Sequence, residues 1–245
     1  MTRPAYFTLT DDGRFAPGES AASWWVPGMI HGRLLGGLMA RQLEAVHGDP
    51  GFQFSRLTVD MFRNAPFEPV EVNSVVVREG RRIRVTEGTV TAGVGAVARA
   101  TAVQLRRGEQ PPGPVPTRTP AWDAPDPASF PRSVTEFGEN PARRRMWVTE
   151  KSPLVEGEAL SPFVRAALAA DLASPLAHRS NGELEFINAD YTLTLSRDPV
   201  GDSIGLESGG HAGDSGVAVG HCTMHDAEGP IGFSMAVAVA NIRAV

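Results

Sequence analysis

The carboxylate best placed for chemistry is Asp190, at the entry of a strand-like stretch. Tyr191, Leu193 and Leu195 alternate with polar residues after it, which is typical of a strand with one buried face. Asp198-Pro199 ends the pattern, because proline has no amide hydrogen for a sheet ladder. A carboxylate shielded from bulk water can act as a general base toward a water molecule. The plain alternative is that Asp190 only caps a turn.

A second candidate is the start of a helix expected over residues 30–46. Apolar residues at helical spacing predict this helix, and Gly48-Asp49-Pro50-Gly51 ends it. The first amides of a helix have no partner within it, and the helix dipole favours negative charge there. His31, Gly32 and Arg33 are therefore candidates to bind an oxyanion through the backbone. The alternative for the His31 side chain is capping or packing.

The chain repeats its own pattern at a shift of 134 positions. This shift places the alternating Leu57, Val59 and Met61 on the three apolar residues that follow Asp190. We therefore predict one fold written twice. The counterpart of Asp190 in the first copy is Arg56, so we expect one active site per chain.

These elements predict an α+β fold with two units, each with one helix and an antiparallel sheet. The first unit covers residues 1–107, a linker covers 108–144, and the second unit covers 145–245. Eight prolines between Arg106 and Asn140 predict an extended crossing. The expected elements are a hairpin or arm over 1–23 that covers the first half, helices over 30–46 and 163–172, and strands over 54–66, 71–77, 83–92, 96–105, 146–149, 186–196, 203–211, 216–225 and 231–241.

Composition narrows the class of protein. The net charge of −5 argues against nucleic acid as a partner. A single cysteine, Cys222, rules out an intrachain disulfide and a cysteine-rich metal site. The sequence shows no apolar run long enough to span a bilayer and no secretory leader pattern. We expect a soluble cytoplasmic protein without a cofactor and without a membrane partner.

Several segments, in chain order, carry a resemblance to a known family. They are Trp24 with Ile30-His31-Gly32, Arg56–Arg63, Glu79-Gly80-Arg81-Arg82, Ser161-Pro162-Phe163-Val164-Arg165, Asp171, Phe186-Ile187-Asn188-Ala189-Asp190, Pro199-Val200-Gly201 and Asp226-Ala227-Glu228-Gly229-Pro230-Ile231-Gly232. The series resembles TesB-like (type II) acyl-CoA thioesterases, which have a double hotdog fold. The resemblance implies that each unit is a hotdog, a central helix wrapped by an antiparallel sheet. It also implies that the helix of one unit faces the strand of the other.

The resemblance further implies a water held by an aspartate, a threonine and a glutamine. The aspartate carries over to Asp190, which would then meet the amides near His31. The threonine position falls at Gly209 or Gly210, and the glutamine position falls at or near Ala236. Neither glycine nor alanine orients a water through its side chain. Ser208, His211 and Ser234 are the polar residues close to these positions.

The expected function is hydrolysis of a fatty or otherwise apolar acyl-CoA to the acid and free coenzyme A. One alternative is an acyl-CoA or acyl-carrier binding protein, which the glycines and the alanine would fit. Another is a hotdog hydratase or dehydratase. Such hydratases place a histidine five residues after the aspartate, where this chain has Leu195. Whether the chain forms a homo-oligomer is left open.

Three further groups have a structural and a functional interpretation. For Trp24-Trp25, burial in the core is favoured over lining an acyl tunnel. For the cluster Arg78, Arg81, Arg82 and Arg84, a solvated strand face is favoured over binding the phosphates of coenzyme A. A metal site at His211, His221 and His225 is not favoured, because they lie on two strands without a carboxylate pattern.

Overall fold

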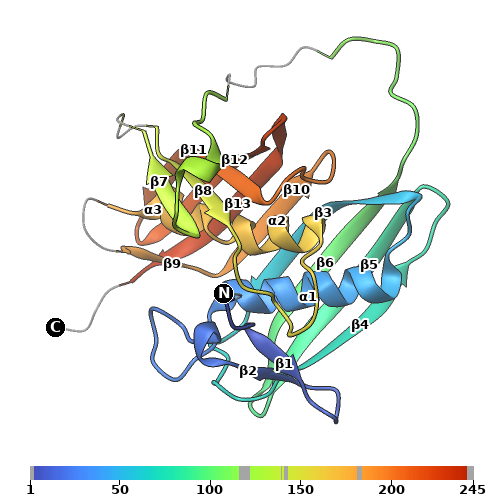
Figure 1. The fold of residues 1–245 in the computed structure, drawn as a ribbon, viewed down its shortest axis with the longest axis vertical. Coiled ribbons are helices and arrows are strands. Elements are labelled where there is room, and N and C mark those ends of the chain that lie inside the picture. The colour runs from blue at the N-terminus through green and yellow to red at the C-terminus, as the bar shows by residue number, and fades with distance from the viewer. Residues whose placement is uncertain (1–2, 116–121, 139, 141–142, 181–183, 242–245) are drawn as a thin grey trace.

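Two sets of helices lie against one long antiparallel sheet (Figure 1). The computed structural model describes residues 3–115, 122–138, 140, 143–180 and 184–241. Its main sheet has eleven strands, ten of them in the order β4-β5-β6-β3-β10-β13-β12-β11-β8-β7, with β9 paired to β13. The apolar core fills the space between the helices and the inner face of this sheet.

The first half follows the predicted order of elements. A hairpin of β1 (Phe7–Leu9) and β2 (Phe15–Pro17) precedes the short helix η1 (Glu19–Ala21). The central helix is α1 (Gly32–His47). The strands are β3 (Phe52–Met61), β4 (Glu71–Arg78), β5 (Ile83–Ala92) and β6 (Gly95–Arg106).

The second half repeats this plan with a broken helix. It begins at β8 (Arg145–Thr149) and continues through α2 (Pro162–Ala170) and α3 (Ala173–His178). The strands that follow are β9 (Phe186–Asn188), β10 (Asp190–Leu195), β11 (Ser203–Asp214), β12 (Val217–Asp226) and β13 (Gly229–Ala240). Ser161 caps α2 by accepting a hydrogen bond from the Val164 amide, as the Ser-Pro start predicts.

The two halves join at β3 and β10, which pair antiparallel. Thr58 pairs with Thr192, and their hydroxyl oxygens lie 3.1 Å apart. These two residues are also 134 positions apart, so each is the other's counterpart in the repeat. A position that pairs with its own counterpart lies on a twofold-like axis, and this confirms the duplication seen in the sequence.

The two central helices pack closely and run in opposite directions. A Cβ at Gly37 would lie 2.5 Å from a Leu168 methyl carbon, and one at Gly36 would lie 2.0 Å from the Tyr191 hydroxyl oxygen. Tyr191 in turn donates a hydrogen bond to the Ala167 carbonyl. The glycines of α1 are therefore needed for close approach of a helix and a strand.

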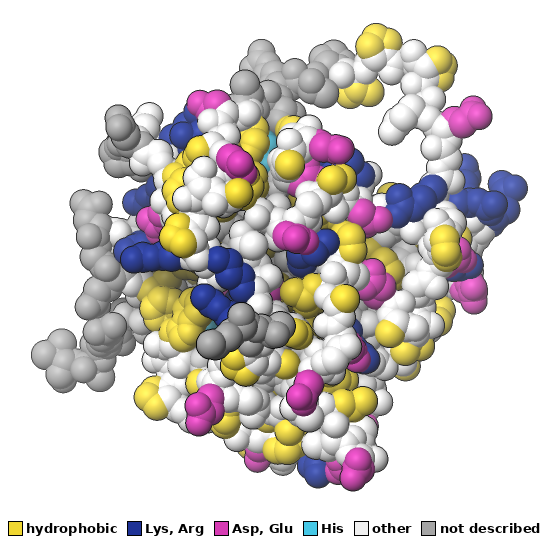
Figure 2. All heavy atoms as spheres, viewed as in Figure 1, with side chains coloured by type: hydrophobic (Ala, Val, Ile, Leu, Met, Phe, Trp, Pro, Cys, Tyr) yellow, Lys and Arg dark blue, Asp and Glu magenta, His cyan; other side chains and the backbone are white. Residues whose placement is uncertain are grey.

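The linker includes more structure than its prolines predict. Strand β7 (Val134–Phe137) extends the sheet beyond β8, and η2 (Pro127–Ser129) precedes it. The reason is that no proline follows Pro131 before the strand ends, so an edge strand can form. Residues 116–121 of the linker lie outside the described residues. The proline-rich part before them arcs away from the body (Figures 1 and 2).

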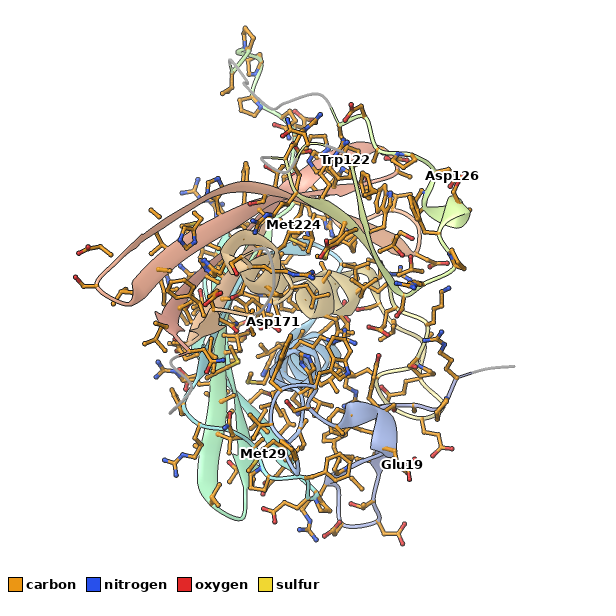
Figure 3. All side chains as sticks on the ribbon, turned by 90° about the vertical axis from the view of Figure 1, so that its left-hand side faces the viewer. Glu19, Met29, Trp122, Asp126, Asp171 and Met224 are labelled. Atoms are coloured by element: carbon orange, nitrogen blue, oxygen red, sulfur yellow. The ribbon has the colours of Figure 1, made fainter. Side chains whose placement is uncertain are left out.

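The part of the linker that returns to the sheet covers its outer face. Trp122 stacks on His225 with ring centroids 4.0 Å apart and meets the edge of Trp147 at 5.5 Å. Gly205 lies under Trp122, because a Cβ there would approach the indole to 2.4 Å. Figure 3 shows Trp122 on the side of the sheet away from Asp171.

Two expectations for the N-terminal region need correction. The hairpin covers both halves, because Phe7 donates a hydrogen bond to the Leu154 carbonyl and Phe15 donates one to the Val70 carbonyl. Trp24 and Trp25 are not in the core: their exposed fractions are 62% and 55%. They lie in the loop before α1, where the chain turns at Val26-Pro27-Gly28 and presents both indoles outward.

Candidate active site

Asp171 is a buried carboxylate at the end of α2, between the helices and the sheet (Figure 3). Its Oδ1 accepts a 2.9 Å hydrogen bond from the Asn188 side-chain amide on β9. Burial raises the pKa of Asp171, while the Asn188 hydrogen bond and the Arg33 charge oppose that rise. A buried carboxylate with a raised pKa is a candidate general base.

A register shift between β9 and β10 brings Asn188 to this position. Asn188 pairs with Ala238, whereas Thr192 pairs with Met235, so the chain has one extra residue between the two pairs. An extra residue of this kind changes which face of the sheet the neighbouring side chains occupy. Asn188 therefore contacts α2 on the inner face, although simple alternation along the strand would place it outward.

The start of α1 lies at the same end of the helix pair as Asp171. His31 caps the helix, with its Nδ1 accepting a long 3.4 Å hydrogen bond from the Arg33 amide. Gly32 is the first helical residue, and a Cβ there would lie 3.0 Å from the Met61 sulfur. As first residue, Gly32 presents an amide that the helix itself does not use. His31, Gly32 and Arg33 thus form the first turn of α1, and their role in binding an oxyanion stays a prediction.

The His31 ring is held neutral by its surroundings. Burial lowers its pKa to about 4, and the Arg33 charge acts in the same direction. Trp24 packs its edge against the ring, with the two ring centroids 4.7 Å apart. Within the described residues the His31 Nε2 and the Arg33 Nε are buried and make no hydrogen bond. Two buried polar atoms beside the first turn of α1 therefore have an unused hydrogen-bonding capacity.

Asp190 lies on the other face of the sheet. The buried residues of β10 are Tyr191, Leu193 and Leu195, and Asp190 is half-buried on the opposite side. Its Oδ1 accepts a 2.9 Å hydrogen bond from the Val237 amide. Burial raises the pKa of Asp190 and the nearby Asp60 adds to the rise, while the Val237 amide opposes it.

The expectation that Asp190 meets the amides of α1 is therefore wrong. The helices pack on the inner face of the sheet, where Tyr191 contacts Gly36, and alternation turns the preceding residue away from them. A catalytic role for Asp190 on this outer face stays a prediction, because the position of a side chain alone does not test its role in a reaction.

Ser208, Gly209, Gly210 and His211 line one hollow of about 420 Å³ at the far end of α3. Its other side is formed by α3 and β9, through His178 and Phe186. The Nδ1 atoms of His178 and His211 lie 2.8 Å apart. His178 lines this hollow and lies seven residues after Asp171, at the other end of α3. The four residues are thus brought together, but not around Asp171.

Ala236 and Ser234 lie on the inner face of β13. Ala236 is buried and pairs with Gly220, whereas Ala238 is the residue opposite Asn188. The Ser234 hydroxyl donates a hydrogen bond to the Ala170 carbonyl, which is part of the unpaired C-terminal end of α2. Ala236 is therefore the inward-facing residue of β13 next to Ala238, which pairs with Asn188.

Two further sequence candidates are the histidines of β11 and β12 and the arginine cluster, of which Arg84 is a member. Across the described part of the chain, no group of three or more His, Cys, Asp or Glu side chains is placed to hold a metal ion. Arg84 is engaged in an ion pair with Asp49 at 2.8 Å and lies over the Phe52 ring, so it stabilises the strand and its turn.

Sequence reasoning passed over Asp171 and Asn188 as functional residues. The available signal was an acidic side chain in an alanine-rich helical segment, within the run Ala169-Ala170-Asp171-Leu172. A charged residue among such small apolar ones is buried only at a free-energy cost, and this marks a site candidate. Nothing in the sequence gives the one-residue shift at Ala189 that brings Asn188 to it.

The repeat, the pairing of β3 with β10 and the two packed helices define a double hotdog protein. The C-terminal domain of acyl-CoA thioesterases matches residues 97–239, and their N-terminal domain matches residues 21–105. The chain belongs to this acyl-CoA thioesterase family and is a thioester hydrolase by that membership.

Solved structures agree on the fold. A protein with a hot dog fold from Alicyclobacillus acidocaldarius is 18% identical, with 96% of each chain covered and a TM-score of 0.73. A tesB protein from Mycobacterium avium subs paratuberculosis is 17% identical over 94% of this chain and 93% of that chain, with a TM-score of 0.65. An acyl-CoA thioesterase II from Mycobacterium marinum is 15% identical over 86% and 91%, with a TM-score of 0.66.

No curated protein matches the sequence significantly. Among the described residues, no helix is long and apolar enough to cross a membrane.

Proposed function

We propose that the protein hydrolyses apolar acyl-CoA thioesters, with Asp171 as the general base. The observation that carries this proposal is the buried Asp171, bonded to the half-buried Asn188, at the same end of the helix pair as the first turn of α1. A base for water and unpaired amides for an oxyanion are the two groups that thioester hydrolysis requires.

In the proposed mechanism Asp171 removes a proton from a water molecule as that water attacks the thioester carbon. Asn188 holds Oδ1 of Asp171, which leaves Oδ2 to accept the proton. The negative charge that develops on the carbonyl oxygen is stabilised by the Gly32 amide and by the positive end of the α1 dipole. When the tetrahedral intermediate collapses, Asp171 returns the proton to the departing coenzyme A sulfur.

The preference for an apolar acyl group rests on the surroundings of α1. Trp24 and Trp25 are exposed in the loop before the helix, and Phe62 and Phe67 are exposed in the neighbouring connection after β3. A hydrogen bond from the Phe67 amide to the Gly28 carbonyl joins the two loops. Exposed aromatic side chains grouped beside a site commonly bind an apolar ligand.

The test is release of free thiol from acyl-CoAs of increasing chain length, with Asp171→Asn and Asp190→Asn as a matched pair. Each variant exchanges one carboxylate for an isosteric amide. We expect Asp171→Asn to slow hydrolysis by about 100-fold or more, the usual scale for losing a general base. We expect Asp190→Asn to stay within a few-fold of wild type.

Each other outcome selects a different assignment. A large loss in Asp190→Asn with normal turnover in Asp171→Asn would make Asp190 the base. Binding of acyl-CoA without thiol release by the wild type would favour the binding-protein alternative. Hydration of an enoyl-CoA in place of hydrolysis would favour the hydratase alternative.

A further inference from the structure

The charge of Arg33 is buried beside the candidate site. Among the ion pairs of the described residues, Arg33–Glu150 is the one in which both side chains are almost wholly covered, with 5% and 6% exposed. Their nitrogen and oxygen lie 2.7 Å apart, and Arg33 also donates a 2.9 Å hydrogen bond to the Tyr6 hydroxyl. Tyr6 closes the triangle with a 2.7 Å hydrogen bond to Glu150.

The antiparallel packing of α1 and α2 brings this triangle to Asp171. Gly37 meets Leu168 where the helices are in contact. One turn back along α1 leads to Arg33, and about one turn forward along α2 leads to Asp171. The charges of Arg33 and Asp171 influence each other's protonation in the expected sense, each favouring the ionised form of the other.

We propose that Arg33 is a positioning residue that keeps the Asp171 carboxylate ionised in the apolar interior, and that Glu150 limits the strength of this effect. The proposal rests on the proposed function, because an ionised Asp171 is the form that accepts a proton from water. Without Glu150, the Arg33 charge would lower the pKa of Asp171 further, and the carboxylate would be a weaker base. Glu150 alone would favour the protonated acid, which cannot act as a base.

The titratable and polar groups on the strands packed against α2 and α3 leave this role to Arg33. Asn188 on β9 donates a hydrogen bond but carries no charge. Tyr191 on β10 is fully buried, and burial raises its pKa well above the usual value, with the Asp171 charge adding to the rise. Cys222 on β12 donates to the Ala173 carbonyl, and burial raises its pKa to about 12. Both side chains are therefore neutral at ordinary pH.

Substitutions of Arg33 and Glu150 are expected to shift the pKa of Asp171 in opposite directions. Arg33→Met removes the favourable charge and leaves Glu150, so Asp171 should titrate at higher pH, by about one unit. Glu150→Gln leaves the Arg33 charge uncompensated, so Asp171 should titrate at lower pH. Arg33→Lys keeps the charge and should restore the wild-type midpoint. The double variant Arg33→Met with Glu150→Gln should lie between wild type and Arg33→Met.

The double variant also guards against misfolding, because it removes both charges of the Arg33–Glu150 pair together and leaves neither member buried without the other. The chain offers a matched control in Arg41→Met and Glu158→Gln. Arg41 lies on the same helix two turns further on, and its ion pair with Glu158 has the same sequence separation of 117 residues. Neither control variant should move the Asp171 midpoint.

Two measurements report the midpoint. One is a carbon-13 NMR titration of the Asp171 carboxyl group, assigned by its loss in Asp171→Asn. The other is the acidic limb of kcat/KM against pH for a medium-chain acyl-CoA. If the pair had only a structural role, the Arg33 and Glu150 variants would lower the stability or the rate without shifting either midpoint.

Unchanged NMR midpoints in Arg33→Met, Glu150→Gln and the double variant would overturn the proposal. If the midpoints shift as expected but the wild type does not hydrolyse thioesters, the charge coupling is supported and the proposed function is wrong. Midpoints that move equally in the Arg41 and Glu158 controls would show a general charge effect, which would also overturn the proposal.

Discussion

At the scale of single residues, the site is defined by polar groups that folding places in the interior. His31 is the clearest case, because its ring is buried, and burial lowers its pKa to about 4 from the ordinary value of 6.5. The folded protein therefore prefers the neutral ring. The stability that depends on His31 is complete above about pH 6.5 and is lost as the pH falls toward 4.

We expect His31→Asn to reduce the acid sensitivity of the fold. Asparagine is a good helix cap and can accept the hydrogen bond from the Arg33 amide, but it does not titrate. The free energy of unfolding of wild type, measured with urea at pH 7 and pH 4.5, should fall by about 2 to 3 kcal/mol more than that of the variant. His221→Asn, at an exposed strand position, is the control. Equal acid losses in wild type and His31→Asn would contradict the prediction.

At the scale of elements, the contact between α1 and β10 depends on Gly36. An alanine inside a helix normally adds about 1 kcal/mol of stability relative to glycine. At Gly36 its Cβ would lie 2.0 Å from the Tyr191 hydroxyl oxygen, and Tyr191 is fully buried. We expect Gly36→Ala to lower the free energy of unfolding by about 1 to 3 kcal/mol, as overpacking does. Chemical denaturation measures this, with Gly108→Ala in open space as control. A stabilised Gly36→Ala protein would show that α1 does not pack against β10 as described.

The elements themselves follow from local patterns in the sequence. Alternation predicts β5 with the correct bounds, and helical spacing followed by Gly48 predicts α1 to within two residues. The Ser161-Pro162 start predicts α2. These features are local, because each depends on neighbours in the chain, and the duplicated pattern adds the pairing of the halves.

The candidate site depends on features that are not local. The break at Ala189 adds one residue to a strand, and with a period of two such a slip changes the face that a side chain occupies. Asn188 therefore reaches Asp171, while Asp190 faces outward. Likewise, the burial of Asp171 results from helix packing between the halves, which no window of sequence contains. The start of α1 was predictable because helix ends have their own chemistry.

At the scale of the whole molecule, the halves are held together by more than the linker. They share the β3–β10 ladder, the helix contact and the hairpin that bridges both. We expect a protease site engineered at Gly113, where there is open space, to yield two fragments that elute together in size-exclusion chromatography. Full denaturation before the column should separate them. Fragments that separate under native conditions would show that the linker is required to hold the halves.

The outer face of the sheet is apolar where an antiparallel sheet is commonly polar. Phe233, Met235, Val237 and Val239 alternate outward along β13, each more than 40% exposed. Val217 and Val219 continue this surface on β12. On the face shown in Figure 2, by contrast, acidic and basic side chains are interspersed. An apolar area of several neighbouring side chains is seldom left in water by a monomer.

We therefore expect two copies of the chain to stack through this outer face in solution. A twofold interface uses the same surface on both copies, so one charged residue is introduced twice across it. Met235→Glu should convert an oligomeric wild type to smaller species in light scattering coupled to size-exclusion chromatography. Val115→Glu, at an exposed linker position, should leave the mass unchanged. Circular dichroism checks that Met235→Glu remains folded. A monomeric wild type, or a folded Met235→Glu protein of unchanged oligomeric mass, would remove the outer face of β13 as the interface.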